Sequence, residues 1–214
     1  MTTRRSWDAH LAVGATGMIG SRNAAEAGKR GHEVTGVARS GKDGTLAADA
    51  SDADTVARLA AGHDAVVLAV SPPQDGIEAA ESLPEVGRGV LDGVRRAGVR
   101  RLAVVGGAGI PEVSLGVRVV DTPGFPEDAL PPVRAQVTLF ELVRDNADDL
   151  EWTCLSPPAV ITSGECTGAY RTGDHQLLSD GEGNSHISTE DYAVALVDEL
   201  QRGELTRRLV HVAY

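Results

Sequence analysis

Three glycines near the N-terminus constrain the fold of this chain more than any other feature. They form the pattern Gly14-Ala-Thr-Gly17-Met-Ile-Gly20, which follows a short apolar run at 11–13 and opens an Ala-rich stretch. A strand, a glycine turn and a helix in this order are typical of a Rossmann-type fold. Gly14 is expected to permit the turn, Gly17 the approach of backbone to a pyrophosphate, and Gly20 close helix packing. The pattern therefore predicts a dinucleotide site at the start of the helix, the alternative being a turn kept only for packing.

The rest of the chain alternates short β-branched runs with longer Ala-rich stretches. This alternation predicts an α/β fold, a Rossmann-type doubly wound parallel sheet with helices on both faces. Further strands are expected at 33–38, 45–48, 65–70, 101–105, 152–155 and 209–213. Helices are expected at 18–30, 52–61, 77–97 and 133–146, and a last one is expected to end at Gln201. Ser51 is expected to cap the second of these, and Pro84 to break or kink the third. The last should begin at a capping box, Ser188-Thr-Glu-Asp191.

Length and charge narrow the classes of function. At 214 residues the chain suits one domain with one core, and a net charge of -11 disfavours a nucleic-acid or anionic-membrane partner. No apolar run approaches the roughly 20 residues that span a bilayer, and the first ten residues lack the apolar region of a signal peptide. Cys154 and Cys166 have no metal-type spacing. We expect a cytoplasmic monomer or homodimer with reduced thiols and no metal, acting on a small-molecule substrate.

The residues after the second predicted strand bear on which dinucleotide is bound. The sequence there is Val-Ala-Arg39-Ser, and no carboxylate occurs before Asp43. NAD-preferring sites usually place a carboxylate at this point, whereas a guanidinium can pair with the 2′-phosphate of NADP. The sequence therefore favours NADP(H) over NAD(H), unless Arg39 is only a solvated surface residue. Asp49 and Ala50 are placed to meet the adenine edge, although Asp49 could instead be a capping neighbour of the next helix.

The stretch at 107–132 is rich in Gly and Pro and has no clear periodicity. Structureless loops of this length are uncommon unless functional, so we expect a substrate lid there. Ser114 lies in this stretch and His175 in a polar segment further on, and both are candidate catalytic residues. Each could instead only shape its loop. Arg22, early in the first helix, is expected to form a surface ion pair with Glu26, the alternative being a contact with a phosphate.

Together these features resemble the atypical short-chain dehydrogenase/reductase superfamily. More narrowly, the chain is similar to the NAD(P)H-flavin reductases, which are related to biliverdin reductase B and the NmrA-like proteins. The resemblance covers nearly the whole chain and depends on the glycine turn, Gly31-His-Glu-Val34, Val104-Val-Gly-Gly-Ala-Gly109, Leu155-Ser-Pro-Pro158 and the stretch 187–196. It implies that Gly106, Gly107 and the segment from Ser156 to Ala159 line the nicotinamide side of the cleft. It also implies that a small C-terminal segment, within 159–188, covers the substrate.

The residues predicted to contact the cofactor, from pattern and resemblance together, are Gly14, Thr16, Gly17, Met18, Ile19, Gly20, Arg39, Asp49, Ala50, Ala69, Val70, Ser71, Gly106, Gly107, Ser156, Pro157 and Pro158. The superfamily's usual Tyr-x-x-x-Lys pair is absent, because the only lysines are Lys29 and Lys42. Carbonyl reduction by the usual proton relay is therefore not expected. The expected function is an NAD(P)H-dependent oxidoreductase that reduces a flavin or a flat conjugated acceptor by direct hydride transfer. The alternatives are a non-catalytic NAD(P) redox sensor and, less favoured, an epimerase or isomerase.

Overall fold

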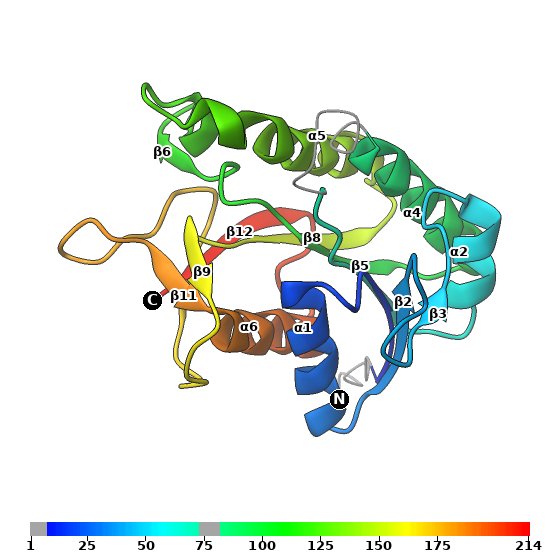
Figure 1. Cartoon of the computed structure of the whole chain (residues 1–214). Coiled ribbons are helices and arrows are strands. Elements are labelled where there is room, and N and C mark those ends of the chain that lie inside the picture. Colours follow the sequence, from blue (N-terminus) through cyan, green and yellow to red (C-terminus); the bar gives the residue numbers. More distant parts are fainter. Residues whose placement is uncertain (1–7, 73–81) are drawn as a thin grey trace.

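An eight-stranded sheet runs through the centre of the computed structural model, which describes residues 8–72 and 82–214 (Figure 1). Across the sheet its strands are β10 (Arg171–Gly173), β12 (Arg208–Ala213), β8 (Glu151–Ser156), β5 (Arg101–Val105), β4 (Ala65–Leu68), β1 (Ala9–Val13), β2 (Glu33–Ala38) and β3 (Leu46–Ala47). Every neighbouring pair is parallel except β10 with β12. The predicted Rossmann-type parallel sheet is confirmed.

The order of the strands reverses beside β1. The chain runs outward from β1 through β2 to β3 and then returns to place β4 on the other side of β1. In open α/β sheets a crevice forms at such a switch point, outside the carboxyl ends of the strands. The topology therefore locates a binding site where β1 and β4 end.

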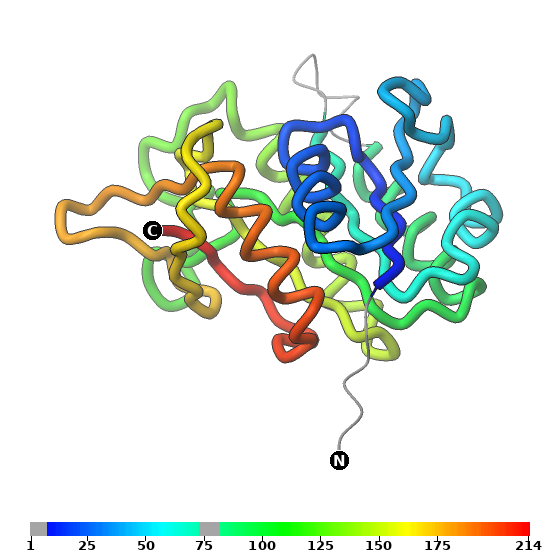
Figure 2. Tube along the Cα trace, turned by 90° about the horizontal axis from the view of Figure 1, so that it is seen from below, coloured from blue at the N-terminus to red at the C-terminus, as the bar shows by residue number. Residues whose placement is uncertain are grey.

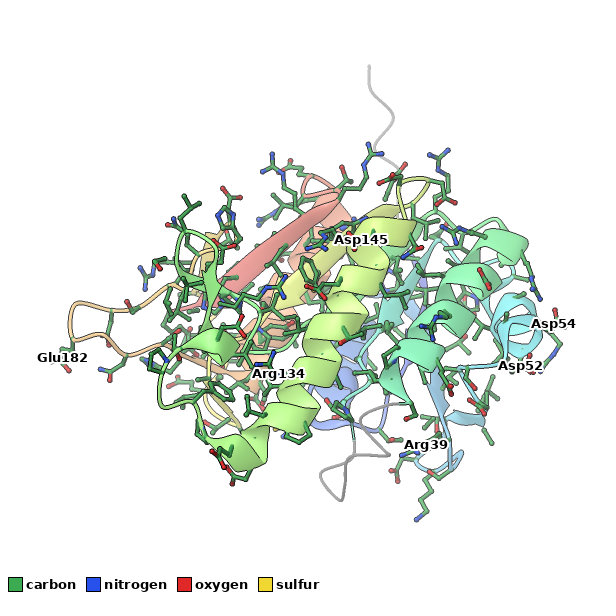
Figure 3. The ribbon with its side chains drawn as sticks, turned by 90° about the horizontal axis from the view of Figure 1, so that it is seen from above. Arg39, Asp52, Asp54, Arg134, Asp145 and Glu182 are labelled. Atoms are coloured by element: carbon green, nitrogen blue, oxygen red, sulfur yellow. The ribbon has the colours of Figure 1, made fainter. Side chains whose placement is uncertain are left out.

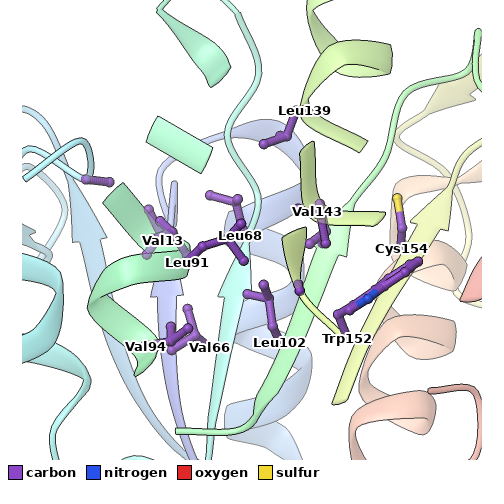
Figure 4. Packing of buried hydrophobic residues seen from close by; sticks show 14 of the residues in the cluster. Val13, Val66, Leu68, Leu91, Val94, Leu102, Leu139, Val143, Trp152 and Cys154 are labelled. Carbon is purple, nitrogen blue, oxygen red and sulfur yellow. The ribbon is translucent and has the colours of Figure 1, made fainter. Parts of the chain in front are cut away.

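Helices cover both faces of the sheet. One face carries α1 (Met18–Lys29) and α6 (Thr189–Arg202), which lie side by side (Figure 2). The other carries α2 (Ala53–Ala60), α4 (Leu83–Ala97) and α5 (Leu130–Asn146). Successive strand residues point to opposite faces, so Val66 and Leu68 pack among the residues of α4 and α5 (Figure 4), while Ala65 and Val67 pack on the side of α6. Each fully buried Val or Leu contributes about 1.5–3 kcal/mol.

Two proline-containing helices differ from their predicted bounds. The predicted start of α4 at 77 lies outside the described residues, and the described helix begins at Leu83. Pro84 then occupies the first turn, where its missing N–H leaves no hydrogen bond unmade, so the predicted break or kink is absent from the described helix. For the same reason α5 begins at Leu130, with Pro131 and Pro132 in its first turn.

The cap residue of α2 and the capping box of α6 also differ from the prediction. Asp52, not Ser51, caps α2, because the Asp52 carboxylate accepts the backbone N–H of Asp54 at 3.1 Å. Ser188 caps α6 as expected and accepts the N–H of Asp191 at 2.9 Å. The reciprocal half of the capping box does not form, since the N–H of Ser188 donates to the hydroxyl of Tyr214 instead.

The predicted covering segments contain short elements. Residues 107–132 hold the hairpin β6 (Glu112–Ser114) and β7 (Val117–Arg118) and the 3-10 turns η1 (Val119–Asp121) and η2 (Glu127–Ala129). Residues 159–188 hold β9 (Val160–Thr162), its parallel partner β11 (His186–Ser188), and β10, which belongs to the central sheet rather than to a cover. The two segments are joined, because the N–H of Glu112 donates to the carbonyl of His175 at 2.7 Å. Within the described ranges, every helix is too short or too polar to span a bilayer.

Candidate functional site

A cleft of about 750 Å³ opens at the carboxyl ends of β1, β2 and β4. The structure brings many of the predicted cofactor residues to its wall, namely Gly14, Thr16, Gly17, Met18, Ile19, Arg39, Asp49, Ala50, Ala69, Val70 and Ser71. Sequence reasoning missed the opposite wall, where Leu83, Glu85 and Val86 of α4 line the same cleft. These residues carry no local motif, and only the packing of α4 beside β4 places them there.

The glycine turn is shaped by close backbone contacts. Gly14 has a φ of +86°, and a Cβ there would collide with the carbonyl oxygen of Ala69, the residue directly after β4. A Cβ on Gly20 would collide with the carbonyl oxygen of Gly14, so Gly20 packs beneath the turn and does not reach the cleft. A Cβ on Gly17 would lie 3.3 Å from that same oxygen, a tight but smaller conflict.

The start of α1 is suited to an anion. Gly17 is the N-cap residue, so it has no side chain to accept the free N–H groups of the first turn, and that turn holds no acidic residue. The helix dipole adds a partial positive charge at the same point. A backbone cradle with free N–H groups and little side-chain bulk fits a pyrophosphate.

The outer end of the cleft carries one cation and one anion. Arg39 projects from the turn after β2 and is exposed to solvent (Figure 3). The carboxylate of Asp49 accepts the hydroxyl of Ser51 at 2.7 Å and its N–H at 2.9 Å, and these bonds hold the pKa of Asp49 below its ordinary value. Asp49 is thus an anion that contacts Ser51 and also lines the cleft, so its contact with adenine stays a prediction.

The residues expected at the nicotinamide side lie deeper and contact one another. Ser156 is fully buried, and its hydroxyl donates to the carbonyl oxygen of Gly107 at 2.5 Å. The carbonyl oxygen of Ser156 in turn accepts a hydrogen bond from Nδ1 of His211 at 2.9 Å. Pro157 and Pro158 are also buried. None of these, nor Gly106, is among the residues that line the described cleft, whose inner limit is Val105.

Neither candidate catalytic residue lies at the cleft. Ser114 is exposed on β6, and His175 is half-exposed with its Nε2 atom 3.9 Å from a carboxylate oxygen of Glu112. Both belong to the junction of the two predicted covering segments. A catalytic role for either would require substrate to reach that junction, and it stays a prediction.

The predicted ion pair between Arg22 and Glu26 is wrong. Arg22 contacts Glu190 at 3.3 Å and the hydroxyl of Ser163 at 2.6 Å, whereas Glu26 pairs with Arg30 at 2.8 Å. The packing of α6 beside α1 supplies Glu190, a partner that helical spacing alone does not show. Arg22 therefore links the first helix to the segment after β9.

All three tyrosines donate hydrogen bonds to groups away from the cleft. The hydroxyl of Tyr192 donates to the carbonyl of Leu155 at 2.6 Å, and burial raises the pKa of Tyr192 well above its ordinary value. Burial, with Asp198 as its hydrogen-bond acceptor, raises the pKa of Tyr170 to about 12. Tyr214 donates to Asp191 at 2.6 Å. None of the three lines the cleft, and residues 8–72 and 82–214 contain no cluster of metal-ligating side chains.

A second cavity of about 360 Å³ lies at the opposite edge of the sheet. It is lined by residues next to the amino ends of β5 and β8, among them Arg100, Asp149 and Glu151. Ligands of open α/β sheets bind at the carboxyl ends of the strands, so the glycine-lined cleft is the candidate site.

Known proteins resemble the chain over almost its full length. The model of the NAD(P)H-binding family matches residues 14–202. A structure from Burkholderia pseudomallei, provisionally described as an exported protein, is 43% identical, covers 96% of this chain and 99% of its own, and has a TM-score of 0.88. One from Bacteroides thetaiotaomicron, provisionally an epimerase, is 33% identical with 98% of each chain covered and a TM-score of 0.88. One from Streptococcus pneumoniae TIGR4, provisionally an NADH-flavin reductase, is 31% identical, covers 96% and 98%, and has a TM-score of 0.79.

Proposed function

Because this chain belongs to the NAD(P)H-binding family, we propose that it is an NADPH-dependent reductase acting on a flavin or a flat conjugated acceptor. The observation that carries the proposal is the cleft itself, which joins the glycine turn and the free start of α1 to Arg39 at its outer end. The 31% identical relative provisionally named an NADH-flavin reductase supports the acceptor class. The NAD(P)H-binding family and the cleft support the oxidoreductase class. The flavin acceptor and the preference for NADP are the more specific parts of the proposal.

Arg39 supports the choice of NADP over NAD. Its guanidinium can form two parallel hydrogen bonds with a phosphate, and it stands on the exposed rim where the second strand ends. The acidic residue that would accept ribose hydroxyls is missing from that turn. Asp49 lies close enough to Arg39 for the two charges to interact, and it would repel a phosphate, so the proposal places the 2′-phosphate against the face of Arg39 that is turned away from Asp49.

All three tyrosine hydroxyls are hydrogen-bonded to groups away from the cleft, which supports hydride transfer without a protein acid. When bound, NADPH supplies the hydride, so a flavin would gain that hydride and one solvent proton and be reduced by two electrons. The residues of the chain bind and align the two partners, which can account for a large part of a rate enhancement. Carbonyl reduction by the superfamily's usual route would need a tyrosine as proton donor, and none of the three tyrosines lines the described cleft. The free thiols Cys154 and Cys166 suit a reducing compartment.

Anaerobic oxidation of NADPH in the presence of FMN, FAD or riboflavin tests the proposal. We expect turnover well above the uncatalysed rate with at least one of these flavins, and weaker activity with NADH. No turnover with any flavin or other conjugated acceptor would refute the reductase. The second candidate is a redox sensor, which is favoured because neither Ser114 nor His175 is among the residues that line the cleft. A sensor would bind NADP⁺ and NADPH with clearly different affinities and catalyse nothing.

A further inference from the structure

The inner end of the cleft is defined by the ends of β4 and β5. A dinucleotide whose pyrophosphate lies at the glycine turn, with its adenosine half beside Arg39, must extend its other half past β1 toward these strands. Val70, just after β4, lines the cleft, and Gly107 follows β5. The spacing of these two strand ends therefore sets the floor on which a nicotinamide ring would lie.

Gln136 of α5 is wedged between those two strand ends. Its Nε2 atom donates a hydrogen bond to the carbonyl oxygen of Val70 at 3.2 Å. Its side-chain stem lies so close to Gly107 that a Cβ on that glycine would come within 2.7 Å of the Cβ of Gln136. The orientation of the amide is determined by this contact, because only the nitrogen can donate to a carbonyl.

The oxygen atom of this amide, Oε1, destabilises the folded state. The side chain of Gln136 is only 8% exposed, and its Oε1 atom has no hydrogen-bond partner within residues 8–72 and 82–214. A buried acceptor left unpaired destabilises a protein, and an aliphatic side chain of the same length would avoid that penalty. The glutamine is therefore poorly explained by stability alone.

We propose that Gln136 is a positioning residue that fixes the ends of β4 and β5 for hydride transfer. Through Val70 it holds the strand end that lines the cleft, and through its packing it holds Gly107. Ser156 fixes Gly107 from the other side through its 2.5 Å hydrogen bond. Gln136 acts through these neighbours, so it affects the alignment of the bound ring and not the affinity of the cofactor. This inference rests on the proposed function, and its test separates the two.

The variant Gln136→Met removes the amide and keeps the length of the side chain. We expect its Tm to be nearly unchanged, because loss of the unpaired Oε1 offsets loss of the hydrogen bond to the half-buried Val70. Its Kd for NADP⁺ should stay within about twofold, while the rate of flavin reduction in a single turnover falls about tenfold. The matched control is Thr138→Val, which removes a polar group from the exposed face of the same helix. An unchanged rate in Gln136→Met, or a rate that falls only with Tm or cofactor affinity, would overturn the proposal.

The variant Gln136→Glu supplies a rescue that a purely structural role would not show. A neutral carboxylic acid can donate to the carbonyl of Val70, whereas a carboxylate cannot. The rate of Gln136→Glu should therefore recover toward that of the native protein as pH falls, and the rate of Gln136→Met should not. Parallel pH profiles for the two variants would contradict the role of the donated hydrogen bond.

The fluorescence of bound NADPH gives a readout that needs no acceptor. Gln136→Met should change the emission of bound NADPH, because the ring environment changes, and Thr138→Val should leave it unaltered. If the native protein reduces no acceptor, the proposed function fails, but the emission still tests the positioning of the ring. Identical emission from native protein and Gln136→Met would refute the positioning role.

Discussion

Ser156 at the end of β8 donates its hydroxyl hydrogen bond to the carbonyl oxygen of Gly107 after β5, 2.5 Å away. The resemblance to flavin reductases placed both residues beside the nicotinamide, and the structure shows that they bind each other. Ser156 is also held by His211, whose Nδ1 donates to its carbonyl. The ends of β5, β8 and β12 are thus joined by hydrogen bonds into one support beneath the inner end of the cleft.

Removing this hydroxyl should weaken the support. In Ser156→Ala the half-buried carbonyl of Gly107 keeps only the N–H of Ile110, 3.2 Å away, so we expect a loss of about 0.5–1.5 kcal/mol of unfolding free energy. Urea denaturation measures the loss. Ser114→Ala is the matched control, because Ser114 is exposed and its removal should change the unfolding free energy by less than about 0.5 kcal/mol. Equal stability of native protein and Ser156→Ala would show that the bond contributes nothing.

Two glycines of the same helix should respond in opposite ways to alanine. Gly20→Ala forces a methyl group against the carbonyl of Gly14, so we expect loss of stability and of NADP⁺ binding. A Cβ on Gly28 would meet no atom within 4 Å among the described residues beyond its own helix backbone, so Gly28→Ala should stabilise the protein by about 0.5–1 kcal/mol through helix propensity. Thermal unfolding with and without NADP⁺ checks both. A tolerated Gly20→Ala would contradict the close packing of the turn on α1.

Reversing the charge at the rim of the cleft should reverse the cofactor preference. Arg39→Asp places a carboxylate where the 2′-phosphate of NADP is proposed to bind, and we expect affinity for NADP⁺ to fall about tenfold or more, with NAD⁺ affected far less. Calorimetric titration with each nucleotide gives the ratio. Lys42→Asp makes the same change of charge three residues away and should leave the ratio nearly unaltered. A preference that survives Arg39→Asp would refute the assignment.

The carboxylate of Asp191 should make stability depend on pH. Burial raises its pKa, but hydrogen bonds from Thr167, Tyr214 and Gly168 outweigh burial, so the pKa lies below its ordinary value. A carboxyl group with a lowered folded-state pKa stabilises the protein above the unfolded-state value, and this contribution is lost as pH falls through the folded-state value. We expect Asp191→Asn to cost about 2–4 kcal/mol at pH 7.

Unfolding free energies measured at several pH values test the role of the Asp191 carboxylate. The difference in unfolding free energy between native protein and Asp191→Asn should shrink as pH falls below about 4, because the carboxyl of the unfolded chain is protonated first and that of the native protein only at lower pH. Asp174→Asn, at an exposed residue 3.7 Å from Arg208, should have little effect at any pH. A difference that stays constant down to pH 3 would contradict the role of the charge.

The sequence was sufficient to predict those features of the fold that depend on the geometry of a few neighbouring residues. The glycine turn and the alternating strands were correct because a tight turn and a two-sided buried strand each impose a local pattern. The cap of α2 was wrong because Ser51 and Asp52 are adjacent candidates of the same chemistry, and only the path of the backbone selects between them. The described part of α4 begins at Leu83 with Pro84 in its first turn, and the break or kink predicted between 77 and Pro84 falls largely outside the described residues.

Features that depend on distant neighbours could not be predicted in this way. Glu190 reaches Arg22 only because α6 packs beside α1, and the spacing between them in the chain is 168 residues. Gln136 contacts Val70 and Gly107 only because α5 packs against the ends of β4 and β5. In the same way, Leu83 and Val86 join the cleft through the packing of α4. Propensity and motif carry no information about such contacts.

The central claim is that the cleft aligns NADPH for direct hydride transfer to a flavin. The most direct measurement is anaerobic stopped-flow reduction of FMN by NADPH carrying deuterium at C4, followed by the bleaching of flavin absorbance. The account predicts flavin reduction by the native protein that is slowed several-fold by deuterium at one face of C4 only. Absence of flavin reduction, or a rate that is the same with both deuterated forms and with unlabelled NADPH, would contradict it.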